Sequence, residues 1–144
     1  ALFDDVPEDQ LSAQPFEGAN HMLWQMGHLA VTDDQFRQLL AGSEGVCPAG
    51  WTELFGMGSE PVGDALTYPS LVELKEKAAE ARNVLIDWFK SQSDEKLREP
   101  TPAEIQSLAP TVGAVMSAVA FHEGMHIGQI TVLRKALGLP RVFA

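Results

Sequence analysis

The sequence is poor in the residues that define several large classes of protein. It has one cysteine, Cys47, among 144 residues. The chain therefore has no internal disulfide framework, and a lone thiol suits a reducing compartment. Ten basic residues against twenty acidic ones give a formal net charge of -10, which argues against nucleic-acid or anionic-membrane partners. No apolar run reaches the roughly 18 residues that a membrane-spanning helix needs. We therefore expect a cytoplasmic protein.

What the sequence does have is enough apolar residues for a core, in a pattern typical of helices. Hydrophobic residues make up 45% of the chain, and at this length residues 1–144 are most simply one domain. Apolar side chains recur at spacings of three and four in three long stretches, which predicts an all-α fold. The expected helices cover residues 20–41, 70–91 and 111–137, with Asn20 and Ser70 as N-caps.

Two connections separate these helices. Residues 42–68 contain six glycines and two prolines, so they predict a long loop, and their apolar side chains favour a loop that folds over one end of the bundle. A packing flap without catalytic function is an equally good interpretation. Residues 92–110 read as a polar linker, in which Thr101-Pro102-Ala103-Glu104 predicts a short helix near 102–108.

Two histidines stand out near the C-terminus, in the segment from Phe121 to Ile130. His122 and His126 are four residues apart in a predicted helix, so their side chains lie on one face and could hold one metal ion. The alternative is a pair of core histidines that only form hydrogen bonds. Both fall on the apolar seam of the helix, where polar rings need partners. Their spacing differs from that of H-E-x-x-H, so a zincin-type protease is not predicted.

A third histidine, His28, lies on the apolar seam of the helix predicted over 20–41. If two antiparallel helices bring it level with His122 and His126, three neutral imidazoles would form a site with an open position. Such a ligand set suits zinc or nickel. His21 could be a fourth ligand, but it is expected to support a ligand or to lie at the surface. The Gly128-Gln129 step indicates close helix packing, with Gln129 as a possible hydrogen-bond donor to a ligand. Cys47 is expected to be a free thiol rather than a fourth ligand.

Four stretches resemble the DinB/YfiT-like superfamily, and the resemblance covers roughly residues 15–138. Trp24-Gln25-Met26-Gly27-His28-Leu29 resembles its early histidine helix, and His122-Glu123-Gly124-Met125-His126-Ile127-Gly128-Gln129 resembles its last helix. Leu54-Phe55-Gly56-Met57-Gly58-Ser59 and Tyr68-Pro69-Ser70-Leu71 resemble its middle region. The resemblance implies an up-down-down-up four-helix bundle, with the first helix mostly missing from the numbered chain and Ala1–Asp5 as its last turn.

The resemblance also implies a divalent metal on His28, His122 and His126, a homodimer, and a small-molecule substrate or thiol. Relatives suggest an enzyme that activates a thiol or water, of the thiol S-transferase or hydrolase type. The alternatives are a non-catalytic stress-response or binding protein with a bound metal, and a histidine-lined core without one. No catalytic acid or base can be named, because Asp33, Asp34, Glu53 and Glu60 are each expected to be solvated surface carboxylates.

Overall fold

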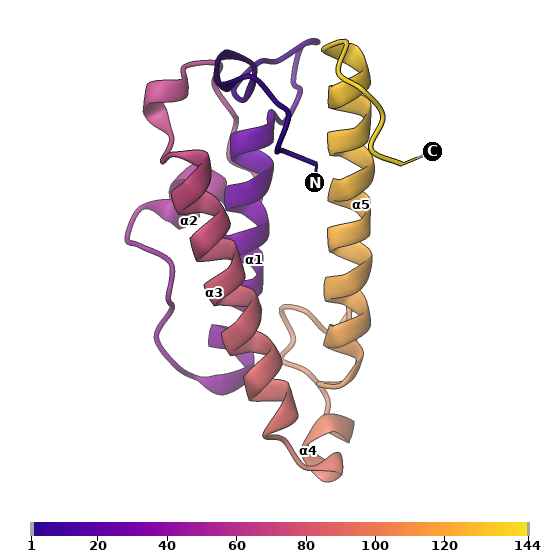
Figure 1. Ribbon diagram of the computed structural model, residues 1–144. Coiled ribbons are helices and arrows are strands. Elements are labelled where there is room, and N and C mark those ends of the chain that lie inside the picture. The colour runs from indigo at the N-terminus through magenta and orange to yellow at the C-terminus, as the bar shows by residue number, and fades with distance from the viewer. Residues whose placement is uncertain (1, 144) are drawn as a thin grey trace.

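The computed structural model describes residues 2–143 and consists of helices joined by loops (Figure 1). Within that range it has no β-strand, only one isolated bridge between Pro100 and Thr111. The described helices, in chain order, are η1 (Glu8–Gln10), α1 (Met22–Ala41), α2 (Trp51–Phe55), η2 (Ala65–Thr67), α3 (Leu71–Lys90), α4 (Asp94–Arg98) and α5 (Ala114–Ala136). The predicted all-α class is confirmed.

The three long helices begin and end close to where the sequence predicts. Ser70 caps α3 by accepting a hydrogen bond from the backbone N–H of Glu73. Gly42 ends α1 in the left-handed conformation, with φ of 62°, that glycine adopts without strain. The N-cap of α1, however, is His21 rather than the predicted Asn20, and its Nδ1 accepts from the backbone N–H of Trp24.

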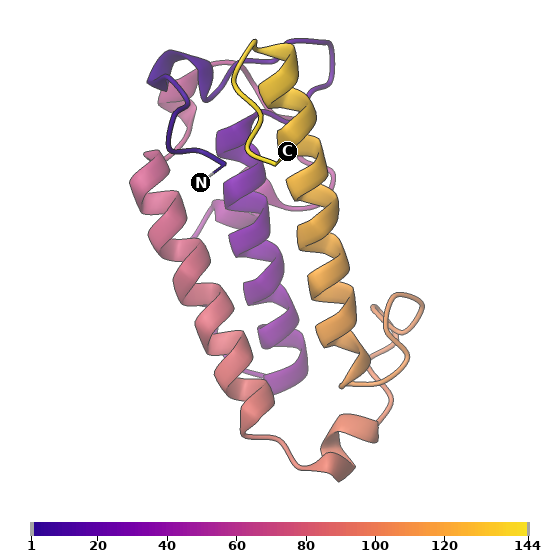
Figure 2. The same ribbon diagram turned by 45° about the vertical axis from the view of Figure 1, so that its right-hand side comes forward.

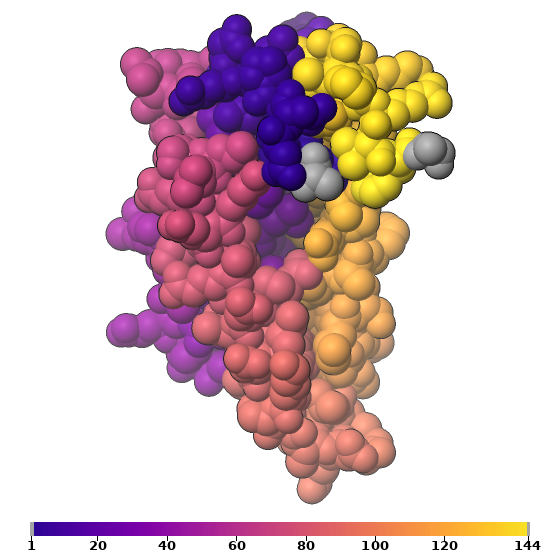
Figure 3. Space-filling model, in the orientation of Figure 1, coloured from indigo at the N-terminus to yellow at the C-terminus, as the bar shows by residue number. Residues whose placement is uncertain are grey.

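The long helices form a bundle in which α1 lies between the other two, as the view in Figure 2 shows. Helices α1 and α3 run in the same direction, and α5 runs the opposite way (Figure 1). This order agrees with the last three helices of the predicted up-down-down-up arrangement. In the space-filling view a furrow separates α3 from α5, and part of α1 is visible at its floor (Figure 3). None of the described helices is both long and apolar enough to cross a bilayer.

The parallel course of α1 and α3 explains the long connection between them. A helix of 20 residues is about 30 Å long, so the chain must travel that distance back before α3 can start. Residues 43–70 make this return over the outside of α1, and α2 and η2 form on the way. Near its end, Val62 accepts a hydrogen bond from His21 Nε2 and donates one to the Tyr68 hydroxyl.

The structure corrects three expectations about local structure. The predicted short helix over 102–108 is a series of turns, and the helix in this linker is α4, which the sequence analysis missed. Ser93 caps α4 by accepting from the backbone N–H of Lys96. The glycine-rich loop contains the helical turn α2, also not predicted. Residues 2–5 form a turn, and Ala1 lies outside the described residues; that this segment is the last turn of a missing first helix stays a prediction.

His21 makes the stability of the fold depend on pH. The ring is fully buried, and burial lowers its pKa from 6.5 to about 4. The unfolded chain therefore binds a proton that the folded chain excludes, so this part of the stability is complete above pH 6.5 and is lost as the pH falls towards 4. A shift of this size corresponds to about 3 kcal/mol.

We expect His21→Asn to remove most of this dependence, because asparagine can still cap α1 but does not titrate. The measurement is the free energy of unfolding of both proteins by urea from pH 7.5 to 4. Subtracting the free energy of unfolding of the variant from that of the wild type removes the contribution of the other titrating groups. This difference is expected to fall by roughly 3 kcal/mol from pH 7.5 to pH 4. A difference that stays constant with pH would contradict the role of His21.

Candidate metal centre

The structure brings three of the four histidines of the chain together in the middle of the bundle. His28 comes from α1, and His122 and His126 come from successive turns of α5. Each offers a ring nitrogen, and these three atoms lie within 4.8 Å of one another. In the described part of the chain, this is the one group of three or more potential ligands that is close enough to hold a metal ion. We refer to it as the histidine triad.

His28 is held in place from two sides. Its Nδ1–H donates to the backbone carbonyl oxygen of Phe55, the last residue of α2, at 2.7 Å. Its ring stacks on the indole of Trp24 one turn earlier, with 4.6 Å between centroids and 11° between planes. The indole Nε1–H in turn donates to the hydroxyl of Ser59. Because Nδ1 is the donor, the lone pair of Nε2 is free to face the other histidines.

His126 is oriented in the same manner by a glutamine. Its Nδ1–H donates to Oε1 of Gln25 at 2.7 Å, and both side chains are buried. The amide Nε2 of Gln25 donates to the backbone oxygen of Asn20, which fixes the amide so that its oxygen faces the histidine. Nε2 of His126 therefore also presents a lone pair to the centre. Support of a ligating histidine through its other ring nitrogen is a regular feature of metal sites.

His122 completes the triad on the more open side. Its Nε2 is 3.2 Å from Nε2 of His28 and 3.0 Å from Nε2 of His126. The neighbouring residue, Glu123, turns away from the triad and accepts a hydrogen bond from Arg82 of α3. Arg82 also donates to the buried carboxylate of Asp33 at 2.5 Å. This ion-pair network links α1, α3 and α5 at the level of the triad.

The surroundings keep the three rings neutral. Burial lowers the pKa of His28, and the hydrogen bond to the Phe55 carbonyl opposes this only in part. For His122, burial and then the charges of His28 and Arg82 lower the pKa. Burial, with His122 and His28 as further causes, lowers the pKa of His126 to about 4, against a hydrogen bond with Gln129. Neutral imidazole is the form that binds metal ions.

These residues fit a divalent transition-metal ion. His28 and His126 each donate their Nδ1–H to a partner on the far side of the ring. Their Nε2 lone pairs therefore point toward Nε2 of His122. Nitrogen atoms that each lie about 2.0–2.1 Å from a tetrahedral zinc ion are roughly 3.3 Å apart. The separations from His122 of 3.0 and 3.2 Å are close to that value. A cation between these nitrogen atoms would satisfy lone pairs that otherwise face one another.

A cavity of about 500 Å³ reaches the triad at His28 and His122. Its other lining residues come from α1, from the start of α5 and from the segment 104–108, and only Met57 belongs to the long connection between α1 and α3. The glycine-rich loop, which was expected to fold over one end of the bundle, thus contributes only Met57 to the wall of this cavity. That loop instead supports the triad from behind, through the carbonyl of Phe55.

Several predictions about residues around the site need correction. Asp33 and Asp34 are not solvated surface carboxylates, because they are only 3% and 1% exposed. Asp33 pairs with Arg82, and Asp34 accepts from the backbone N–H groups of Val46 and Cys47. Both are thus structural.

His21 and Cys47, the other polar residues considered for the site, also have structural rather than catalytic roles. His21 neither supports a ligand nor lies at the surface, because it caps α1. Cys47 is a free, half-buried thiol, as predicted, and burial raises its pKa to about 12. A thiol of this kind stays protonated and is a poor nucleophile.

Comparison with known proteins agrees with this arrangement. The chain is a helical bundle with a histidine triad, shared between an early and a late helix, that could hold a metal ion. A family model described as the DinB superfamily matches residues 1–130, and the chain belongs to that superfamily. The comparisons with curated proteins and with solved structures gave no match.

Two supporting groups, the carbonyl of Phe55 and the amide of Gln25, were not identified from the sequence. The Phe55 carbonyl is a backbone group, which leaves no trace in side-chain patterns. Gln25 had a usable signal, since it is a polar residue next to Trp24 and three residues before His28, on the face of α1 that becomes buried. A buried amide on that face requires a partner.

Gln25→Leu is expected to weaken metal binding about 10- to 100-fold, the usual cost of losing such a support. Leucine has a similar size, so the helix is kept while the hydrogen bond to His126 is lost. The measurement is a competition titration of the metal with a chromophoric chelator. Gln38→Leu is the matched control, because Gln38 lies on the same helix and bonds only to Asp34. Equal affinities for the two variants would contradict the role of Gln25.

Proposed function

We propose that the protein is a metal-dependent enzyme that carries one divalent ion, zinc or nickel, on His28, His122 and His126. When bound, such an ion supplies Lewis-acid chemistry that turns a thiol or water into a nucleophile at neutral pH. The observation that carries the proposal is the convergence of three neutral Nε2 atoms beside a cavity. The reaction class is thiol S-transfer or hydrolysis.

The arrangement of the protein's own groups supports a catalytic rather than a purely structural ion. A closed structural zinc site has four protein ligands, whereas this site offers three histidines and borders a cavity on the side of His28 and His122. Gln25 and the Phe55 carbonyl fix two of the rings, so the triad is held before any ligand arrives. The cavity gives a substrate access to the open side.

Neither the thiol of Cys47 nor the carboxylates of Asp33 and Glu123 are placed to act as the nucleophile. The Cys47 thiol has its pKa raised to about 12 by burial and lies on the return segment rather than in the cavity. Asp33 and Glu123 are both engaged by Arg82. This favours a nucleophile that comes from solution, either water or a low-molecular-weight thiol.

The test combines metal content with turnover. Purified protein is assayed with a panel of low-molecular-weight thiols and electrophiles, and with activated esters and amides in the absence of thiol. Turnover by the metal-loaded protein, its loss after chelation and its return with added metal are the expected results. A protein that holds one metal ion per chain and turns over none of these substrates would favour a non-catalytic binding role. A protein without metal would contradict both.

A further inference from the structure

The cavity beside the triad has a chemical character of its own. It is lined by residues of four segments, and eight of its fourteen lining side chains are apolar: Phe36, Leu39, Met57, Ile105, Leu108, Ala118, Phe121 and Met125. Its volume of about 500 Å³ is within the range of pockets that bind small organic molecules. The polar side chains beside the two histidines are Thr32, Gln35, Glu104 and Ser107.

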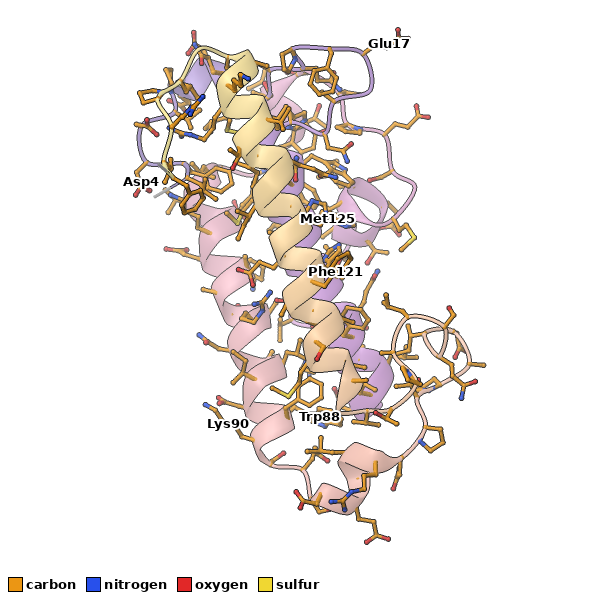
Figure 4. The ribbon with its side chains drawn as sticks, turned by 90° about the vertical axis from the view of Figure 1, so that its right-hand side faces the viewer. Asp4, Glu17, Trp88, Lys90, Phe121 and Met125 are labelled. Carbon is orange, nitrogen blue, oxygen red and sulfur yellow. The ribbon has the colours of Figure 1, made fainter. Side chains whose placement is uncertain are left out.

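Exposed apolar side chains gather at the mouth of this cavity. Among the described residues, thirteen large hydrophobic side chains are exposed, and five of them line this one cavity: Leu39, Met57, Leu108, Phe121 and Met125. Phe121 and Met125, which are 71% and 44% exposed, lie one turn apart on α5 (Figure 4). A concentrated apolar surface around a concave site marks a place where an apolar ligand is covered.

Charge limits what this cavity can accept. None of its described lining residues is a lysine or arginine, and Glu104 is the one acidic residue among them. The nearby cation Arg82 is already paired with Asp33 and Glu123. The chain as a whole carries a formal charge of -10. A carboxylate or phosphate group held in the cavity away from the triad would lose its hydration without gaining a cationic side chain, which is costly.

From this geometry we infer that the cavity binds the uncharged, mainly apolar part of a small organic substrate and directs its one polar or reactive group to His28 and His122. The half-buried His122 and the buried His28 form the floor, and the exposed side chains form the rim. The inference deepens the proposed function and rests on it for the reaction at the floor. In an S-transfer, the apolar electrophile would occupy the cavity; in a hydrolysis, the apolar acyl or amide group would.

The test uses two probes that share one aromatic body and differ in charge. Naphthalene-2-methanol is neutral, and naphthalene-2-sulfonate is an anion whose sulfonate is a weak metal ligand. Binding of each is measured by isothermal titration calorimetry to the protein as purified and to the chelated protein. We expect the alcohol to bind at least tenfold more tightly than the sulfonate in both forms. Equal or tighter binding of the sulfonate, or no binding of either probe, would overturn the inference.

Two variants on the same helix locate the binding. Ala118→Leu fills the cavity and is expected to weaken alcohol binding at least tenfold. Ala120→Leu makes the same change two residues later, where the side chain is exposed and borders the furrow between α3 and α5 instead. Its affinity is expected to equal that of the wild type. Unchanged affinity in a folded Ala118→Leu variant would show that the probe binds elsewhere and overturn the inference.

A third variant keeps the test decisive if Ala118→Leu does not fold. Leu108 is 55% exposed in a turn at the rim, so Leu108→Lys leaves the core intact while adding a cation. We expect it to tighten sulfonate binding at least threefold, and no gain would count against the inference. Because the probes bind without turnover, alcohol binding in a protein that has no metal or activity would contradict the proposed function alone.

Discussion

His122→Ala is expected to reduce bound metal from about one ion per chain to below roughly a tenth, because three ligands are the minimum found in zinc sites of this kind. The loss of metal affinity should exceed the 10- to 100-fold loss that follows removal of a group that only supports a ligand. His122 is the most suitable of the triad for this test. It lies half-buried on the open side, and its ring nitrogen faces the other two histidines rather than a core partner.

The measurement is elemental analysis of the purified proteins, with a thermal melt to show that the variant is folded. His21→Asn is the matched control, since it removes the fourth histidine of the chain, which is buried but outside the triad. That control is expected to keep its metal. Metal retained by the His122 variant, or lost equally from both variants, would exclude the triad as the binding site.

Phe55→Ala is expected to cost about 3–5 kcal/mol of stability, the usual loss for a phenylalanine removed from a core. The side chain is fully buried. Its ring packs against Trp51 and Tyr68, with centroids 5.2 and 5.8 Å apart. It also lies directly over Gly27, where a Cβ atom would come within 2.4 Å of the ring. Phe55 thereby fixes α2 against α1.

The same variant is expected to weaken metal binding about 10- to 100-fold, because a displaced α2 moves the carbonyl that holds His28. Stability is measured by chemical denaturation and affinity by chelator competition. Met57→Ala is the control: this side chain is 95% exposed just beyond α2, so its stability should change by no more than about 0.5 kcal/mol. A Phe55 variant with lowered stability but normal metal affinity would show that the carbonyl keeps its place without the ring.

The sequence contains enough to predict the long helices, because these depend on local periodicity, whereas the complete triad is what the resemblance to the DinB/YfiT-like superfamily implies. His122 and His126 share a face at any point where the segment is helical. His28 is buried in α1, and antiparallel packing against α5 brings it to the same level as the other two histidines. The homodimer, the identity of the metal and the cytoplasmic location stay predictions.

What the sequence analysis missed depends on contacts between distant segments. Asp33 and Asp34 look like surface residues because acidic side chains usually are, yet Arg82 and the backbone at Val46 and Cys47 bury them. Gly124 and Gly128 do not mark a close helix contact, because a Cβ atom added at either would meet nothing within 4 Å. The glycine that mattered for packing is Gly27, whose partner, Phe55, is 28 residues away in sequence.

The separation of the triad in the sequence also ties metal loading to the folding equilibrium. His28 and His122 are 94 residues apart, so one ion bound to both would close a very long loop of the chain. In the unfolded state these ligands are scattered, and an ion that binds only the native state stabilises it by RT ln(1 + [M]/Kd). At a hundredfold excess over Kd this amounts to about 2.7 kcal/mol. If the triad carries an ion, its removal is expected to loosen the attachment of the last helix to the first long one, as well as altering the site.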